Sequence, residues 1–101
     1  MFSNASRQLK IAGMLPHGPN HANGSRVIRE LLRKGSISEY AYFDLVDDKV
    51  GEKLLEANVF ADHFNSGQIT FQSTVMKRFC EKESAYWEEE ARNAPLRRFV
   101  S

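Results

Sequence analysis

The side chains best suited to metal or nucleophilic chemistry are one cysteine, Cys80, and three histidines, His17, His21 and His63. A structural zinc site needs four nitrogen or sulfur ligands, and these residues follow no recognised ligand spacing. Cys80 falls on the apolar face of a predicted helix, where a thiol packs as a small apolar side chain. We therefore expect no metal site and no cysteine nucleophile.

Hydroxyl and carboxylate groups give no stronger signal for catalysis. No serine lies in a Gly-x-Ser-x-Gly elbow, and no Gly-x-x-x-x-Gly-Lys-Ser/Thr loop is present to hold a triphosphate. The neighbouring carboxylates Asp47 and Asp48 are better explained as helix caps. The sequence predicts a protein that is not an enzyme and that binds no cofactor.

The charge is balanced overall but unevenly distributed. The chain has 14 Lys and Arg against 13 Asp and Glu, a net charge of +1, which gives no general attraction to nucleic acid or anionic membrane. Residues 1–35 hold six cations and one anion, Glu30, and so carry +5. Arg26, Arg29 and Arg33 recur on one side of a predicted helix. Such a row either keeps a surface helix soluble or binds phosphate or carboxylate.

Prolines and glycines divide the chain. The segment HGPNHANG, residues 17–24, is predicted to be an irregular connector. We expect residues 1–24 to be an irregular N-terminal segment, residues 25–93 the folded domain and residues 94–101 a basic C-terminal tail. The apolar residues of the first segment either form a short helix docked on the domain or pack on another domain; they are Leu9, Ile11, Met14 and Leu15.

Three short helices are predicted at the start of the domain. Ser25 and Gly35 bound the first, Ser36 or Ser38 caps the second, and Asp47 or Asp48 caps the third. The apolar positions of the second helix are Ile37, Tyr40, Ala41, Phe43 and Leu45. Those of the third are Val50, Leu54 and Leu55, with Asn58 closing it.

Two alternating runs, VFADHF and QITFQS, then surround an Asn65-Ser66-Gly67 turn and predict a β-hairpin. Its inward positions are Phe60, Phe64, Ile69 and Phe71. A long final helix runs from Ser73 or Thr74 to Arg92 or Asn93, before Pro95. This order indicates an α+β fold, a small winged helix-turn-helix-like domain with a hairpin wing and a long C-terminal helix.

The third helix of a winged-helix domain normally enters the major groove of DNA. Here residues 47–56 carry four acids and two lysines, a net charge of −2, and the wing sequence DHFNSGQ has no Lys or Arg. DNA phosphates would repel this surface. We therefore expect a protein-protein interaction or regulatory module, with Glu52 and Glu56 facing a protein partner. Nucleic-acid binding through Arg26, Arg29 and Arg33 is the alternative.

The final helix carries a second candidate for protein binding. Glu83 interrupts its apolar face, which predicts that the helix leaves the core near residue 82. Tyr86 and Trp87 then either pack on the N-terminal apolar residues or form an exposed anchor for a protein partner. A homo-oligomer is also possible, with the basic first helix of one copy against the acidic third helix of another.

Residues 54–83 resemble a segment near the C-terminal end of the ATPase domain in fungal P-loop (AAA+-type) ATPases. The most specific matches are Asn58-Val59-Phe60 and Thr70-Phe71-Gln72-Ser73. The resemblance implies a winged-helix-like appendage. Because the phosphate-binding loop is missing, it implies no ATPase activity.

The chain has no apolar stretch of signal-peptide or membrane-spanning length. A single cysteine suits a reducing compartment. We expect an intracellular protein, cytoplasmic or nuclear, without membrane attachment.

Overall fold

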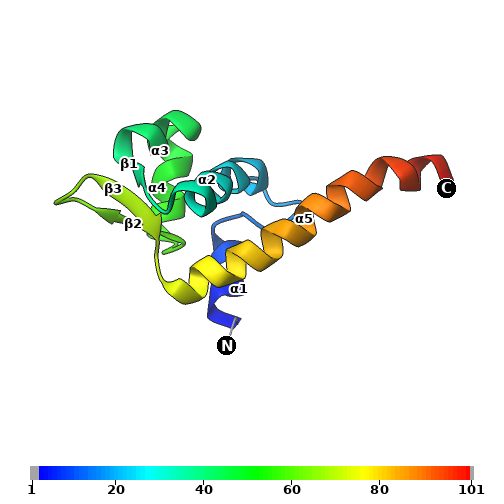
Figure 1. The fold of residues 1–101 in the computed structure, drawn as a ribbon, viewed down its shortest axis with the longest axis horizontal. Helices are drawn as coiled ribbons and strands as arrows, with labels where there is room; N and C mark the ends of the chain where they lie inside the picture. The colour runs from blue at the N-terminus through cyan, green and yellow to red at the C-terminus, as the bar shows by residue number, and fades with distance from the viewer. Residues whose placement is uncertain (1–2, 101) are drawn as a thin grey trace.

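The structure is a computed structural model that describes the backbone of residues 3–100 and the side chains of residues 4–93. Five helices and three strands follow one another within this part of the chain (Figure 1). They are α1 (Ser3–Ile11), α2 (His21–Lys34), β1 (Ile37–Ser38), α3 (Glu39–Leu45), α4 (Asp48–Glu56), β2 (Phe60–His63), β3 (Gln68–Phe71) and α5 (Thr74–Val100). The predicted α+β class is confirmed.

The strands form one antiparallel sheet in the order β1-β3-β2. The His63 carbonyl accepts hydrogen bonds from the amides of Ser66 and Gly67, at 3.0 and 2.8 Å, and closes the turn between β2 and β3. Gly67 has φ +65°, which glycine adopts without strain. The predicted hairpin and turn are therefore confirmed. The inward assignment of Phe64 was wrong: it is 82% exposed because it lies in the turn, beyond the paired residues.

The first 24 residues are mostly ordered into helices, which corrects the prediction of an irregular segment. The side chain of Asn20 is buried, and its Nδ2 donates to the Ala12 carbonyl at 2.9 Å. This bond holds the proline-glycine loop against the end of α1. Helix α2 begins at His21, directly after this loop, whereas the sequence predicted a start at Ser25. The predicted boundary at residue 24 lies inside α2. Of the two arrangements considered for the apolar residues, the structure has the docked helix, with Leu9 fully buried.

Short polar side chains begin α3 and α4 as the sequence predicted. Ser38 Oγ accepts a hydrogen bond from the Ala41 amide, and Asp47 Oδ1 accepts one from the Val50 amide, both at 3.0 Å. Because Ile37 and Ser38 pair with β3, α3 starts at Glu39, and its buried face differs from the predicted one. Tyr42 is fully buried, whereas Tyr40 is 87% exposed.

Helices α3 and α4 approach closely at Gly51. The Tyr42 hydroxyl donates to the Gly51 carbonyl at 2.7 Å. A Cβ atom on Gly51 would lie 2.6 Å from Cε1 of Phe43, closer than two carbons can pack. Only glycine therefore permits this contact without a shift of the Phe43 ring. The contact fixes how α4 is rotated about its own axis.

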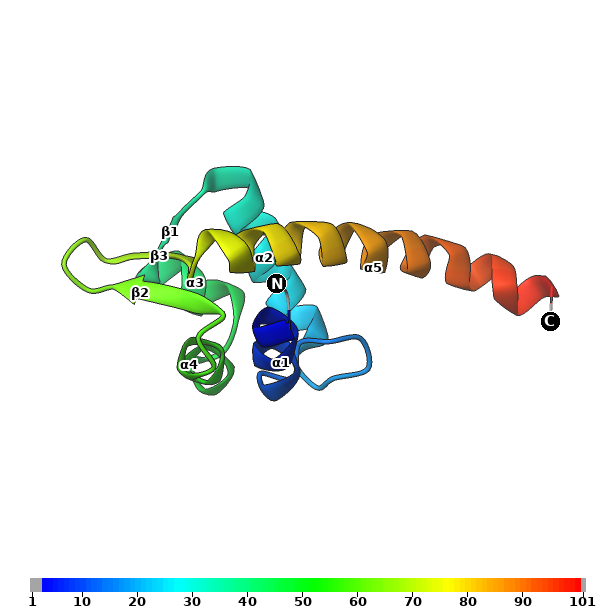
Figure 2. The ribbon, with the colours of Figure 1, turned by 90° about the horizontal axis from the view of Figure 1, so that it is seen from below.

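Helix α5 crosses the body and then projects beyond it (Figure 2). Its inner face contributes Met76, Phe79, Cys80 and Trp87 to the core. The predicted departure near residue 82 was wrong, because the helix stays against α2 as far as Trp87. The predicted end before Pro95 was also wrong: the helix continues to Val100 and takes up most of the expected tail. Proline removes one helical hydrogen bond, which a helix can accommodate by bending.

Replacing Tyr42 with Phe tests the contact between α3 and α4. The variant loses the hydrogen bond to Gly51, and we expect the free energy of unfolding to fall by about 1 kcal/mol, measured by urea denaturation. Tyr40→Phe is the matched control, and its exposed hydroxyl should change stability by less than about 0.5 kcal/mol. Equal losses in the two variants would contradict the inferred role of the Tyr42 hydroxyl.

Candidate functional site

The outward face of α4 is charged and mainly acidic. Lys49, Glu52, Lys53 and Glu56 are all exposed, whereas Gly51 and Leu54 are buried. The cap residues Asp47 and Asp48 are exposed as well. The structure therefore places Glu52 and Glu56 in solvent, on the side of α4 away from the core. The net charge of −2 over residues 47–56 is presented outward.

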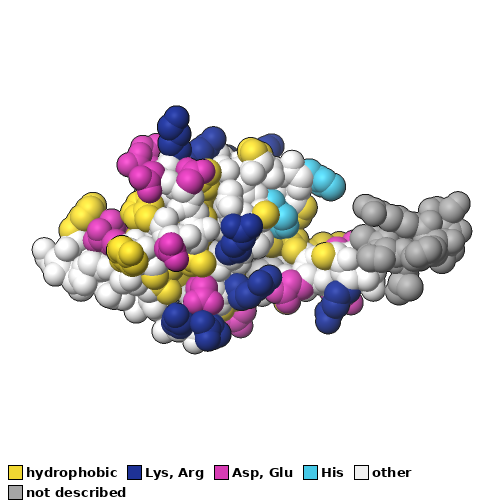
Figure 3. Space-filling view, turned by 90° about the horizontal axis from the view of Figure 1, so that it is seen from above, with side chains coloured by type: hydrophobic (Ala, Val, Ile, Leu, Met, Phe, Trp, Pro, Cys, Tyr) yellow, Lys and Arg dark blue, Asp and Glu magenta, His cyan; other side chains and the backbone are white. Residues whose placement is uncertain are grey.

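A shallow hollow lies between α3 and α4, and we call its lining the acidic–aromatic surface. Its residues are Glu39, Tyr40, Phe43, Asp44, Asp48 and Glu52. Carboxylates and two aromatic rings line it, without a Lys or Arg. Figure 3 shows Asp and Glu side chains beside hydrophobic ones toward the end of the molecule that carries the hairpin. Such a mixture can take up both apolar and cationic groups of a partner.

Two carboxyl groups meet where α3 reaches the hairpin. The Glu39 amide donates to the Gly67 carbonyl at 2.9 Å, and its side chain lies beside Asp62. A hydrogen bond with Asp62, loss of hydration and the Asp62 charge all raise the pKa of Glu39. When both groups are ionised neither can donate, and Asp62 Oδ1 is then buried without a partner among the described residues.

The buried phenol of Tyr42 adjoins this acidic pair. Burial raises the pKa of Tyr42, and the negative charge of Asp62 raises it further. The phenol therefore stays protonated and continues to donate its hydrogen bond to Gly51. Glu39 and Tyr42 lie on α3 and Asp62 on β2, and no spacing in the sequence connects them, so this cluster could not be predicted from the sequence.

Arg26, Arg29 and Arg33, which we call the arginine row, are exposed on α2. Arg33 lies 3.1 Å from a Glu30 carboxylate oxygen, and Arg29 lies 3.8 Å from one of Glu88. The Arg26 guanidinium donates to Asn23 Oδ1 at 3.4 Å. Hydrogen bonds from Arg33 and Lys34 lower the pKa of Glu30. These exposed pairs are weak and can exchange for other partners.

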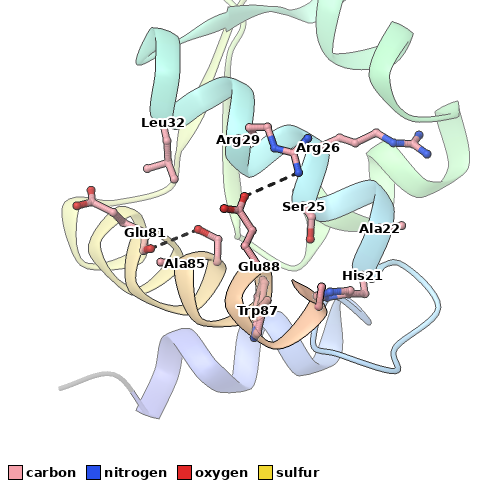
Figure 4. A pocket seen from close by; sticks show the side chains of 12 residues that line it. His21, Ala22, Ser25, Arg26, Arg29, Leu32, Glu81, Ala85, Trp87 and Glu88 are labelled. Carbon is pink, nitrogen blue, oxygen red and sulfur yellow. Dashed lines mark hydrogen bonds and ion pairs between the residues drawn. The ribbon is translucent and has the colours of Figure 1, made fainter. Parts of the chain in front are cut away.

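A second hollow separates α2 from α5, and Figure 4 shows the residues around it. Trp87 is only 9% exposed and packs edge-on against His21, with ring centroids 4.9 Å apart. His21 Nδ1 lies 2.8 Å from the Met14 carbonyl, which fixes the ring. Trp87 is therefore packed and not an exposed anchor, and its ring contact is with His21 of α2. Tyr86 remains 58% exposed.

The residues singled out for metal or nucleophilic chemistry lie apart in the described part of the chain, each in a different setting. Cys80 is fully buried, and burial together with the Glu83 charge raises the pKa of its thiol to about 12. His63 instead bonds the Thr70 hydroxyl at 2.9 Å. Among the residues that the structure describes, no three His, Cys, Asp or Glu side chains are placed to hold a metal ion.

No family model, curated protein or solved structure matches this chain. The resemblance of residues 54–83 to fungal P-loop ATPases stays a prediction from the sequence. Across the described residues, no helix combines the length and the apolar character needed to cross a bilayer.

Alanine substitutions at Tyr86 and Trp87 compare the loss of an exposed ring with the loss of a packed ring. We expect Trp87→Ala to lower the free energy of unfolding by about 3–5 kcal/mol, because it removes a buried ring and leaves a cavity. Tyr86→Ala should cost much less, since that ring is mostly in solvent. Thermal unfolding followed by circular dichroism measures both. A small loss for Trp87→Ala would show that its ring does not support the fold.

The carboxyl pair makes stability depend on pH. Because the pKa of Glu39 is raised in the folded state, its protonated form stabilises the fold at acid pH, and this contribution is lost as the pH rises through that pKa. Asp62→Asn removes one charge and supplies an amide donor. The variant should melt at a higher temperature than the wild type near neutral pH, with the difference shrinking at acid pH. Glu56→Gln, a change away from the pair, should show no such trend.

Proposed function

We propose that this chain is a non-catalytic protein-interaction module on a winged-helix-like body, and that its partner docks on the acidic–aromatic surface. The order of elements from α2 to β3 supports the winged-helix interpretation. A helix and a short strand precede two helices and a hairpin, and the short strand pairs with the second hairpin strand. In a winged-helix domain the helix that reads DNA comes at this point in the order of elements, and α4 is its counterpart under the proposal.

The charge of α4 is the observation that carries the proposal. Its outward side chains sum to −2 with the caps, and the hairpin turn contributes no cation. A DNA-reading helix gains most of its non-specific affinity by neutralising phosphates. An acidic helix beside a wing without cations loses that affinity and repels the duplex backbone.

The aromatic residues favour a protein in this place. Tyr40 is 87% exposed, which is unusual for a large ring, and it stands among four carboxylates beside the half-buried Phe43. Tyrosine is enriched among the residues that supply most of the binding energy at protein interfaces. The surrounding carboxylates would set the orientation of a partner and the rate of its association.

Nucleic-acid binding is a second candidate function, favoured by the arginine row alone. The side chains of Arg29 and Arg33 are 68% and 65% exposed, and both guanidinium groups can reach an external phosphate. Contacts of this kind would be made by α2 and would position a backbone without reading its sequence.

Fluorescence anisotropy with a labelled random duplex tests the two candidates. We expect the wild-type chain to bind more weakly than about 10 μM at physiological salt, because α4 repels the phosphates. Changing Glu52 and Glu56 together to Lys should strengthen binding at low salt. Tight wild-type binding that weakens steeply between about 50 and 200 mM salt, with a shallower slope after Arg26, Arg29 and Arg33 become Ala, would overturn the proposal.

A capture experiment tests protein binding through the exposed ring of Tyr40. A partner captured from an extract of the source cells should be retained by the wild type and by Tyr86→Ala, and lost with Tyr40→Ala. Both substitutions remove an exposed tyrosine, so Tyr86→Ala controls for the loss of a surface ring, and circular dichroism checks that both variants are folded. Equal retention by the two variants would show that the acidic–aromatic surface is not the binding site.

A further inference from the structure

We infer that the partner of the acidic–aromatic surface is a second copy of this chain, which presents its arginine row. This inference rests on the proposed function and specifies the partner. Its first support is charge. The surface offers four carboxylates and no lining cation, whereas the row offers three guanidinium groups. The two surfaces therefore carry opposite charge, and because the whole chain carries only +1, two copies do not strongly repel each other overall.

The guanidinium groups are available for such a contact. Arg26 makes no ion pair with any residue that the structure describes, and the Arg29–Glu88 pair is long, at 3.8 Å. Arg33 donates to both carboxylate oxygens of Glu30, and Lys34 Nζ lies 3.3 Å from one of them, Oε2, so Lys34 would keep Glu30 paired if Arg33 moved. Exposed pairs contribute little, so exchanging them for contacts across an interface costs little.

The acidic–aromatic surface suits arginine better than a simple cation. Glutamate and aspartate can bind a guanidinium through two parallel hydrogen bonds, and an exposed tyrosine ring can stack on its plane. Tyr40 and its neighbouring carboxylates place both kinds of contact in one hollow. Lysine would use only the charge, so we expect Arg26 and Arg29 to fit this surface better than lysine at the same positions.

The arrangement of the two surfaces permits a closed dimer. Helices α2 and α3 are consecutive and in contact, joined through β1. Figure 3 shows Lys and Arg side chains near the middle of the face on which acidic and hydrophobic side chains gather toward the hairpin. A twofold axis through this face lets the row of each copy meet the surface of the other. The same contact is then made twice, which closes the assembly.

Charge reversal in pairs tests the inference by sedimentation velocity on the full chain. We expect the wild type to dimerise at low salt and to dissociate as salt rises. Asp48→Lys with Glu52→Lys reverses the surface, and Arg26→Glu with Arg29→Glu reverses the row. Each double variant alone should raise the dimer dissociation constant about tenfold or more. An equal mixture of the two should restore the dimer, because every contact again joins opposite charges.

The control variant reverses Lys77 and Arg78 to Glu, two exposed cations of α5 that lie outside both surfaces. Its dimer should be unchanged. Circular dichroism establishes that each variant is folded. A monomeric wild type, a dimer insensitive to either reversal, or a mixture that fails to reassociate would each overturn the inference. Tyr40-dependent capture of a different protein, with a monomeric wild type, would keep the proposed function and discard the self-association.

Discussion

The close approach of α3 to α4 at Gly51 determines which side of α4 faces solvent. The Tyr42 hydroxyl reaches the Gly51 carbonyl, and the Phe43 ring occupies the space that a side chain on residue 51 would need. With Gly51 and Leu54 held inward, Glu52 and its charged neighbours must point outward. The Phe43 ring at this contact also lines the hollow beside Tyr40 and the carboxylates. The binding properties proposed for this face therefore depend on one glycine and one buried phenol.

The N-terminal segment has a comparable role for α5. The buried Asn20 amide holds the loop between α1 and α2, and this loop places His21 where its ring meets Trp87. Trp87 consequently supports the body, and the part of α5 beyond it projects. Of the two aromatic residues considered as an anchor for a partner, Trp87 is packed and Tyr86 is exposed. The exposed Tyr86 stands apart from the acidic–aromatic surface, which makes it a useful reference residue.

Most of the secondary structure could be predicted from local signals. Ser38, Asp47 and the turn glycine Gly67 cap or close their elements through contacts with residues a few positions away, and such contacts are visible in the sequence. The errors have a different origin. Phe64 was placed inward because strand alternation was extended past the end of β2. Tyr40 was placed inward because the helical face was counted from Ile37, which belongs to β1 and not to α3. Contacts between separate segments, such as Asn20 with Ala12 or Glu39 with Asp62, follow no pattern in the sequence and so could not be predicted from it.

Helix α4 and the hairpin turn present a negative, cation-poor surface that should not engage a DNA duplex. Nuclear magnetic resonance of the isotopically labelled chain, titrated with random duplex DNA at low salt, tests it residue by residue. We predict that amide signals of residues 48–56 and 64–67 will not shift, and that any weak shifts will come from α2. Progressive, salt-sensitive shifts of the α4 amides would contradict the account.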